Sequence, residues 1–212
     1  MPGHPVVAAI YDRMLAGNER AGLREMRAEL LAAAHGRVLE LGAGTGLNLV
    51  HYTDRVGELV LTEPDPHMAK RLRRRAAELQ LPFELQVAEV SGEKLPFPDH
   101  SFDTIVATLV FCTVGDPVRT VSELARVLRP DGELLSIEHV RGEQGSSRAR
   151  WQDRLDRPWG WVAGGCHPNR DTAEALSASF DVSALQTDVM PGTNPPIVKP
   201  LIRGIARPVA PA

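Results

Sequence analysis

Short apolar runs alternate with amphipathic segments through most of this chain. Two segments, 66–79 and 117–128, carry apolar residues at three- and four-residue intervals, and an acidic residue followed by proline opens each one, as at a capped helix start. The apolar runs have the length of buried strands and are bounded by turn-forming residues; they are 38–41, 58–62, 83–87, 102–109 and 133–140. This alternation predicts an α/β fold, with a parallel sheet covered by helices on both faces.

The two ends of the chain depart from this alternation. Residues 5–34 have apolar positions at helical spacing with a break at Gly17-Asn18, which predicts two helices before the first strand. After residue 140 we expect a helix interrupted near Pro158, a short helix at 171–176, and an antiparallel pair of strands at 180–186 and 201–206. The sheet would then have seven strands, mostly parallel, with an antiparallel last strand.

The first apolar run leads into three glycines at alternate positions, Gly42, Gly44 and Gly46. Glycine permits positive φ and close approach of the backbone to a ligand, so this stretch predicts a tight turn into a helix at a cofactor site. A dinucleotide fingerprint would need a small residue where this chain has Leu47. The run also places Glu40 in a buried strand, where we expect the carboxylate to face a cationic group. The pattern E-x-G-x-G-x-G resembles the first motif of the Rossmann-like S-adenosylmethionine methyltransferases.

Further candidate cofactor contacts follow the second and third strands. Glu63, followed by Pro64, lies next to the glycine turn, where a carboxylate suits the two hydroxyls of a ribose. The stretch Ser91-Gly92-Glu93 resembles the methyltransferase segment that lines the adenine, although Ser91 stands where an acid is common. Glu93, Glu89 or backbone groups alone could therefore bind the adenine amine.

The fourth and fifth strands point to the transfer site. Thr108 and Leu109 end the fourth strand, and ligands of open α/β sheets bind at the carboxyl ends of the strands. Cys112 would lie near that site, either facing the substrate or as an inert buried thiol. His139, at the end of the fifth strand, could accept a proton, stabilise a thiolate, or only order the strand end.

Composition and charge restrict the other classes of function. A net charge of −3 gives no basic surface for nucleic acid. The two cysteines lie far apart, and the seven histidines show no metal-ligand spacing, so we expect no metal site and a reducing, cytoplasmic location. There is no apolar run long enough to span a membrane and no signal peptide. We expect a monomer or homodimer that acts on a small molecule.

Taken together, these stretches resemble the class I S-adenosylmethionine-dependent methyltransferases over residues 36–206, and more closely the methyltransferase-like protein 7 group, similar to thiol S-methyltransferases. The animal members of that group begin with an apolar membrane anchor, which this chain does not show. Similar sequences occur among bacterial enzymes acting on phosphatidylethanolamine, quinones or natural products. The closer resemblance rests on 39–46, 91–93, 108–114, 126–130 and 138–140, with Trp151-Gln152 and Gly165-Cys166.

The resemblance implies a single methyltransferase domain over residues 1–212. It would have a helical cap at 5–34, a cofactor-binding core at 36–140 that includes Ala43, and a substrate side at 141–212. We expect S-adenosylmethionine as the cofactor and a small hydrophobic acceptor, with a thiol favoured. An apolar wall of Tyr11, Trp151 and Trp159 would hold the acceptor. The alternatives are methylation of a phenol, amine or phospholipid headgroup and, from other classes, a nicotinamide-dependent oxidoreductase or a non-catalytic binding module.

Overall fold

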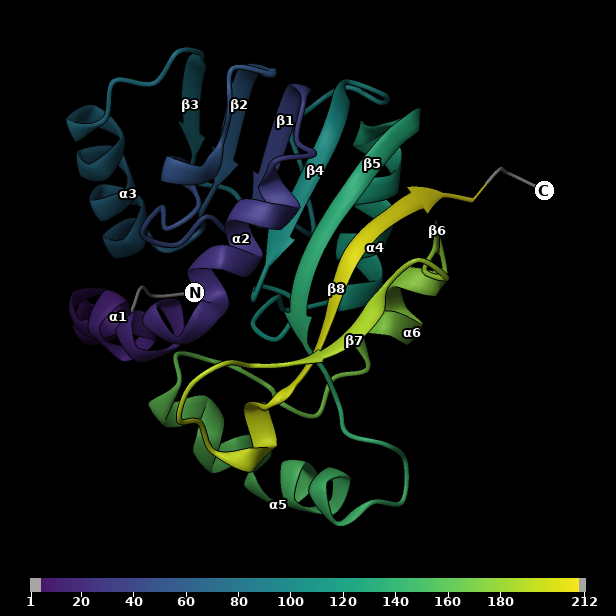
Figure 1. The fold of residues 1–212 in the computed structure, drawn as a ribbon. Helices are drawn as coiled ribbons and strands as arrows, with labels where there is room; N and C mark the ends of the chain where they lie inside the picture. Colours follow the sequence, from purple (N-terminus) through teal and green to yellow (C-terminus); the bar gives the residue numbers. More distant parts are fainter. Residues whose placement is uncertain (1–4, 210–212) are drawn as a thin grey trace.

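The computed structural model describes residues 5–209, which form an α/β fold around one sheet (Figure 1). The strand order is β3-β2-β1-β4-β5-β8-β6, and β7 also pairs with β8. Strands β1 to β5 are parallel, whereas β8 runs antiparallel to β5. The strands are β1 (Gly36–Leu41), β2 (Val56–Thr62), β3 (Glu84–Ala88), β4 (Phe102–Thr108), β5 (Leu128–His139), β6 (Phe180–Asp181), β7 (Gln186–Val189) and β8 (Pro200–Pro208). The expected sheet is confirmed, with one more strand than the sequence predicted.

Helices cover both faces of the sheet, as the alternating pattern predicted. Apolar residues of α2 and α3 pack on one face, and those of α4 and α6 pack on the other. The helices are α1 (Pro5–Asn18), α2 (Arg24–Leu31), α3 (Pro66–Glu78), α4 (Pro117–Val127), α5 (Ser147–Val162) and α6 (Thr172–Ser177). Asp65 caps α3 and Asp116 caps α4, each by accepting backbone N–H groups of the first turn.

The first helix ends where the sequence indicated, but the kink of the chain lies further on. Helix α1 ends at Asn18, and a π-helical segment, Glu19–Leu23, follows it directly. The chain changes direction at Gly22, where φ is 130°. The amide of Asn18 donates to the carbonyl of Pro191 and to the side chain of Asn194, so it holds the end of α1 to a distant loop. The predicted break at Gly17-Asn18 therefore marks the end of α1, and the kink at Gly22 was not predicted.

The glycine turn leads into a shorter helix than expected. Only a single turn of 3-10 helix, Leu49–His51, follows it before β2. This segment turns the side chains of Asn48, Leu49 and Tyr52 inward, and all three are buried. With so few residues between Gly46 and Val56, an α-helix could not both bury these side chains and return the chain to the sheet.

The C-terminal part also differs in detail. Helix α5 runs through Pro158, which lies at an exposed position, so water can bind the carbonyl that proline leaves unpaired. The predicted strand 180–186 is divided into β6 and β7, which pair with opposite ends of β8. The division lies over Gly204, where φ is 144° and an added Cβ would lie 3.0 Å from the carbonyl oxygen of Ala184. Within residues 5–209, no helix combines the length and apolar composition needed to cross a bilayer.

Candidate active site

The carboxyl ends of the parallel strands meet at one edge of the sheet, and α1 and α5 lie beyond that edge (Figure 1). In an open α/β sheet this edge is where ligands bind. The sequence placed its candidate residues on the loops that follow β1, β2, β3, β4 and β5, and the parallel order of these strands brings all of those loops to this edge.

The glycine turn after β1 has a backbone that only glycine adopts readily. Gly42, Gly44 and Gly46 all have positive φ, at 60°, 58° and 84°. A Cβ added at Gly42 would lie 2.3 Å from Val110 of the loop after β4, and one at Gly46 would meet Leu72 of α3 at 2.7 Å. Ala43, between them, is buried and donates its N–H to the carbonyl of Thr62. The turn is thus fixed by its neighbours, with Gly44 the least crowded of the three glycines.

Glu63 lies against this turn, as the sequence predicted. Its carboxylate accepts the backbone N–H of Gly44 at 2.8 Å and that of Asp65 at 2.9 Å. Burial raises the pKa of Glu63, and the two N–H groups oppose this rise. Pro64 follows it on the exposed side of the loop. The carboxylate therefore joins the ends of β1 and β2 at the position expected for a ribose.

Glu40 is held by a buried network of neutral donors. One carboxylate oxygen accepts the amide of Asn48 at 3.0 Å, and the other accepts the hydroxyl of Tyr52 at 2.7 Å. The nearest linked cation is Arg27 of α2, which donates to the Asn48 side-chain oxygen at 2.8 Å. Among the described residues, Asn48 stands between the charges of Glu40 and Arg27. The expectation that Glu40 faces a cationic group of the cofactor stays a prediction.

Protonation of Glu40 should make the free energy of unfolding depend on pH. Burial raises its pKa from the ordinary 4.5 to about 7, against the hydrogen bonds from Tyr52 and Asn48. The folded state then binds this proton more tightly than the unfolded state, so stability falls as pH rises between 4.5 and 7. The loss from one such group is up to about 3 kcal/mol. The free energy of unfolding, measured with urea at pH 5, 6, 7 and 8, should fall less with rising pH in Glu40→Gln than in wild type. An equal fall in the two proteins would contradict the raised pKa of Glu40.

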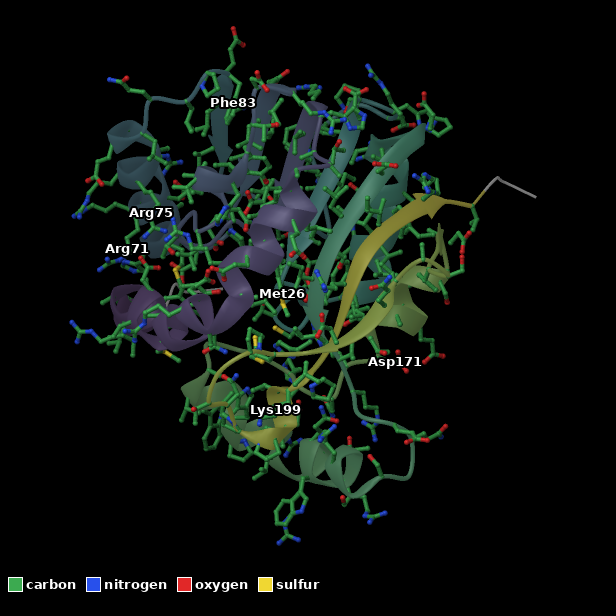
Figure 2. The ribbon with its side chains drawn as sticks, viewed as in Figure 1. Met26, Arg71, Arg75, Phe83, Asp171 and Lys199 are labelled. Atoms are coloured by element: carbon green, nitrogen blue, oxygen red, sulfur yellow. The ribbon has the colours of Figure 1, made fainter. Side chains whose placement is uncertain are left out.

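Helix α1 covers the glycine turn. A Cβ added at Gly44 would lie 3.8 Å from the ring of Tyr11, so the tyrosine faces the glycine turn. The neighbouring Asp12 accepts the hydroxyl of Thr45 within the turn and pairs with Arg75 of α3. Figure 2 shows Arg75 in the space between α3 and α1 (Figure 2). These contacts hold the N-terminal helix over the turn and α3.

The two acids expected near an adenine are both engaged by the protein. Glu93 accepts the backbone N–H groups of Gly115 at 2.6 Å and Asp116 at 3.2 Å, and Glu89 pairs with Arg73 at the surface. Ser91 is exposed, whereas Gly92 is buried so tightly that an added Cβ would lie 2.8 Å from Leu41. This arrangement favours backbone groups of 91–93 over a free carboxylate as the ligands of an adenine amine.

The loop after β4 is set by an unusual backbone conformation. Leu109 has φ of 55°, which is uncommon for a residue with a side chain. This turn directs the N–H groups of Val110 and Phe111 onto the two carboxylate oxygens of buried Glu138, at 3.0 and 3.2 Å. Burial raises the pKa of Glu138 to about 7. Thr108, just before the turn, accepts hydrogen bonds from Arg27 and Asn48 and so belongs to the network around Glu40.

Cys112, His139 and Cys166 form a buried cluster at the same edge of the sheet. Their sulfur and ring nitrogen atoms all lie within 4.8 Å of one another. His139 Nε2 lies 3.4 Å from the Cys166 sulfur, and the indole of Trp159 donates to that sulfur at 3.3 Å. The hydrogen bond from Cys112 lowers the pKa of Cys166, with His139 and Trp159 adding to the effect, and the pKa of Cys112 is correspondingly raised. Distances along the sequence gave no sign of this cluster.

The tryptophans do not form the wall that the sequence suggested. Trp159 is half-buried against Cys166, but Trp151 is 54% exposed and stacks with Arg154, while Trp161 is 87% exposed. The helical stripe of α5 places Trp151 two turns from Trp159. Ala149 and Gln152 are the buried residues at that end of the helix. The structure therefore brings Trp159, and not Trp151, to the cluster.

Several residues of the site were not predicted from the sequence. Gln152 is fully buried and bonds four backbone groups, the N–H of Gly142 and the carbonyls of Val140, Pro168 and Ile197, so it fixes α5 against the edge of the sheet. The donors around Glu40, which are Arg27, Asn48 and Tyr52, were also missed. The sequence signal for them was Glu40 itself, because a buried carboxylate requires donors.

Comparisons with known proteins agree with this arrangement. A family model described as a methyltransferase domain matches residues 39–136. The human thiol S-methyltransferase TMT1A is 32% identical over 93% of this chain and 81% of its own length. The phosphatidylethanolamine N-methyltransferase of Cereibacter sphaeroides is 35% identical over 72% of this chain and 75% of its own. Rat and human thiol S-methyltransferases TMT1B also match, and the chain spans 55% and 66% of their lengths.

A solved structure gives the same fold. A methyltransferase of Thermotoga maritima, described as a possible histamine N-methyltransferase, superimposes with a TM-score of 0.66 at 22% identity, over 96% of both chains. Sequence similarity over most of a curated relative, the family model on the glycine turn and the shared topology all agree. The chain therefore belongs to the class I S-adenosylmethionine-dependent methyltransferases, enzymes that take a methyl group from that cofactor.

Proposed function

We propose that this protein transfers the methyl group of S-adenosylmethionine to the sulfur of a small, hydrophobic thiol. The observation that carries this proposal is the buried cluster of Cys112, His139 and Cys166 at the carboxyl ends of β4 and β5. A cluster that lowers the pKa of one of its own thiols offers an incoming thiol the same stabilising surroundings. The similarity to thiol S-methyltransferases, which extends over 81% of human TMT1A, supports the same acceptor class.

In this proposal the cofactor lies across the glycine turn. Gly42, Gly44 and Gly46 bind its methionine and ribose, Glu63 accepts the two ribose hydroxyls, and the backbone beside Gly92 binds the adenine. Residues 5–34 act as the cap over the cofactor, residues 36–140 as the cofactor-binding core, and the chain beyond residue 140 as the acceptor side. Tyr11, which faces Gly44, would separate cofactor from solvent.

Methyl transfer requires mainly that the reacting atoms are aligned and that water is excluded. Transfer from a sulfonium is an in-line displacement with a good leaving group, so the thiolate, the methyl carbon and the cofactor sulfur must lie in one line. A small thiol has a pKa of about 8.5, and modest stabilisation yields enough thiolate near neutral pH. Burial raises the pKa of Tyr11, and the nearby Cys112 and Glu63 add to the rise, so this side chain lies between the cluster and the cofactor side.

The second candidate is nitrogen methylation of a phospholipid headgroup. It is favoured by one observation, the similarity to the phosphatidylethanolamine N-methyltransferase of Cereibacter sphaeroides over 75% of that protein. An amine acceptor must first lose a proton and therefore needs a firmer base. The carboxylates nearest the cluster are already engaged, Glu138 with two backbone N–H groups and Asp156 with His167. This arrangement suits a thiol better than an amine.

A matched set of acceptors tests the proposal. Phenylethanethiol, phenylethylamine and a phenol of similar size present different nucleophilic atoms on one hydrocarbon body, and phosphatidylethanolamine vesicles complete the set. With labelled S-adenosylmethionine, we expect turnover of the thiol to exceed that of the others by at least about tenfold, a difference of about 1.4 kcal/mol in transition-state stabilisation. Clear turnover of the amine, the phenol or the lipid with none of the thiol would overturn the assignment.

The role of His139 is tested separately. The hydrogen bond with Cys166 and the charges of Cys166 and Glu138 raise its pKa more than burial lowers it. His139 lies beside the proposed acceptor position and would help to stabilise a thiolate there, so His139→Ala should shift the pH dependence of thiol turnover upward. Thiol turnover that is unchanged in His139→Ala from pH 6 to 9 would remove histidine from the mechanism while leaving the acceptor assignment standing.

A further inference from the structure

The buried cluster of Cys112, His139 and Cys166 has the composition of a metal site. Two thiolates and one imidazole are ligands that zinc prefers. The cysteines are 3% and 7% exposed and the histidine is 6% exposed, so all three side chains are shielded from water. Within residues 5–209 these are the three residues that could together hold a metal ion.

The spacing of the atoms fits tetrahedral coordination. Bonds of about 2.3 Å to sulfur and about 2.0 Å to nitrogen place neighbouring ligand atoms about 3.3–3.8 Å apart. His139 Nε2 and the Cys166 sulfur lie 3.4 Å apart, and all three ligand atoms lie within 4.8 Å of one another. Separations of up to 4.8 Å would have to shorten by at most about 1 Å to close the three atoms around one ion.

Bonding around the cluster is incomplete without an ion. His139 Nδ1 is buried and has no hydrogen-bond partner within the described residues, and Nε2 has only the contact with sulfur. A buried polar ring without a strong partner is costly, and ligation through Nε2 would replace its weak contact with sulfur by a bond to the metal. The charges also balance, because two thiolates and a divalent ion form a neutral buried unit.

The surrounding groups already hold the ligands in place. Trp159 donates its indole N–H to the Cys166 sulfur, which is the kind of second interaction that orients a metal-bound thiolate. The carbonyl of Cys112 accepts the N–H of His167 at 2.8 Å, and the loop before it is fixed on Glu138. His139 is the last residue of β5, a rigid strand paired on both sides.

We propose that Cys112, His139 and Cys166 bind one zinc ion whose fourth position receives the sulfur of the acceptor thiol. Three protein ligands and one open position are typical of catalytic zinc sites. This use of the fourth position rests on the proposed thiol acceptor; zinc binding itself does not. The thiol gives its proton to solvent and binds zinc as a thiolate. Its sulfur then forms a bond to the methyl carbon as the bond from that carbon to the sulfonium sulfur breaks, giving a neutral thioether and S-adenosylhomocysteine. The thioether is a weaker ligand and leaves.

Zinc binding is tested on the whole chain, purified under reducing conditions, stripped with a chelator and titrated with Zn²⁺ alone. We expect one ion per chain. Loading with Co²⁺ should give the visible absorption of a tetrahedral ion together with thiolate-to-metal charge transfer. Cys112→Ser, Cys166→Ser and His139→Gln should each weaken zinc binding more than the loss of a group that only hydrogen-bonds a ligand, which costs about 10–100-fold. His167→Gln, beside Cys166 but bonded to Asp156, is the matched control and should bind as wild type.

Each outcome has a defined meaning. Wild-type protein that binds no zinc, or that binds it equally well in the three ligand variants, overturns the site; so does a Cys112–Cys166 disulfide that persists under reducing conditions and keeps the protein from binding the metal. Binding of S-adenosylhomocysteine by each variant shows that it is folded. Phenylethanethiol added to the cobalt form without cofactor should shift the charge-transfer band. Zinc bound without this shift, or thiol methylation undiminished in stripped protein, would make the metal structural while leaving the thiol acceptor standing.

Discussion

Replacing Glu63 with alanine is expected to weaken binding of S-adenosylhomocysteine by at least about 100-fold. The carboxylate lies at the carboxyl end of β2 against Gly44, and we propose that it accepts both ribose hydroxyls. Two hydrogen bonds to a charged group contribute about 1.5–3 kcal/mol each, and every 1.4 kcal/mol is a factor of about ten in affinity. Isothermal titration at pH 8 measures the loss.

Two further variants distinguish the loss of the proposed ribose contact from damage to the glycine turn. Glu58→Ala removes a carboxylate at the other end of the same strand, where it pairs with Arg37, and should leave affinity unchanged. Glu63→Gln keeps one acceptor oxygen and should lose less affinity than Glu63→Ala. Equal affinity of Glu63→Ala and wild type would show that the ribose lies elsewhere.

Replacing Arg27 with methionine is expected to destabilise the protein by about 3–5 kcal/mol. The guanidinium is buried and pairs with Glu19 at 3.0 Å while donating to Asn48 and Thr108. Removing one partner of a buried pair leaves the other charge without compensation, which typically costs this amount. A domain has only about 5–15 kcal/mol of stability, so a large share would be lost. Urea unfolding at pH 8 measures it.

The same helix provides the control for Arg27. Arg24 of α2 is exposed, and Arg24→Met should change the stability by less than about 0.5 kcal/mol. Because Arg27 reaches Glu40 through Asn48, the Arg27 variant should also raise the pKa of Glu40 and enlarge the loss of stability toward neutral pH. A loss as small as that in Arg24→Met would show that the buried network does not stabilise the fold.

The cofactor side of the fold was predicted from the sequence because its signals are local. The glycines, the acid after β2 and the two capped helices are each written within a few neighbouring residues, and the parallel order of the strands brings them together. The kink at Gly22 was not predicted, because the break that Gly17-Asn18 indicated marks only the end of α1. The contact that holds this end, from Asn18 to Pro191, joins residues 173 positions apart in the sequence.

The acceptor side could not be predicted, because its signals are not local in the sequence. Cys112, His139 and Cys166 come from a loop, a strand end and a second loop, and only tertiary packing places them within 4.8 Å of one another. For that reason, the spacing of the cysteines and histidines along the sequence did not indicate a metal site. Trp151 and Trp159 lie on one helical stripe, but a stripe does not tell which of its turns the sheet covers, and here Gln152 takes the buried place at one end.

A crystal structure of the complex with S-adenosylhomocysteine tests this arrangement most directly. We predict that both ribose hydroxyls lie within hydrogen-bond distance of the Glu63 carboxylate, and that the sulfur of the homocysteine faces the cluster of Cys112, His139 and Cys166. A ribose held by other groups, or a sulfur directed away from that cluster, would contradict both the cofactor site and the proposed site of methyl transfer.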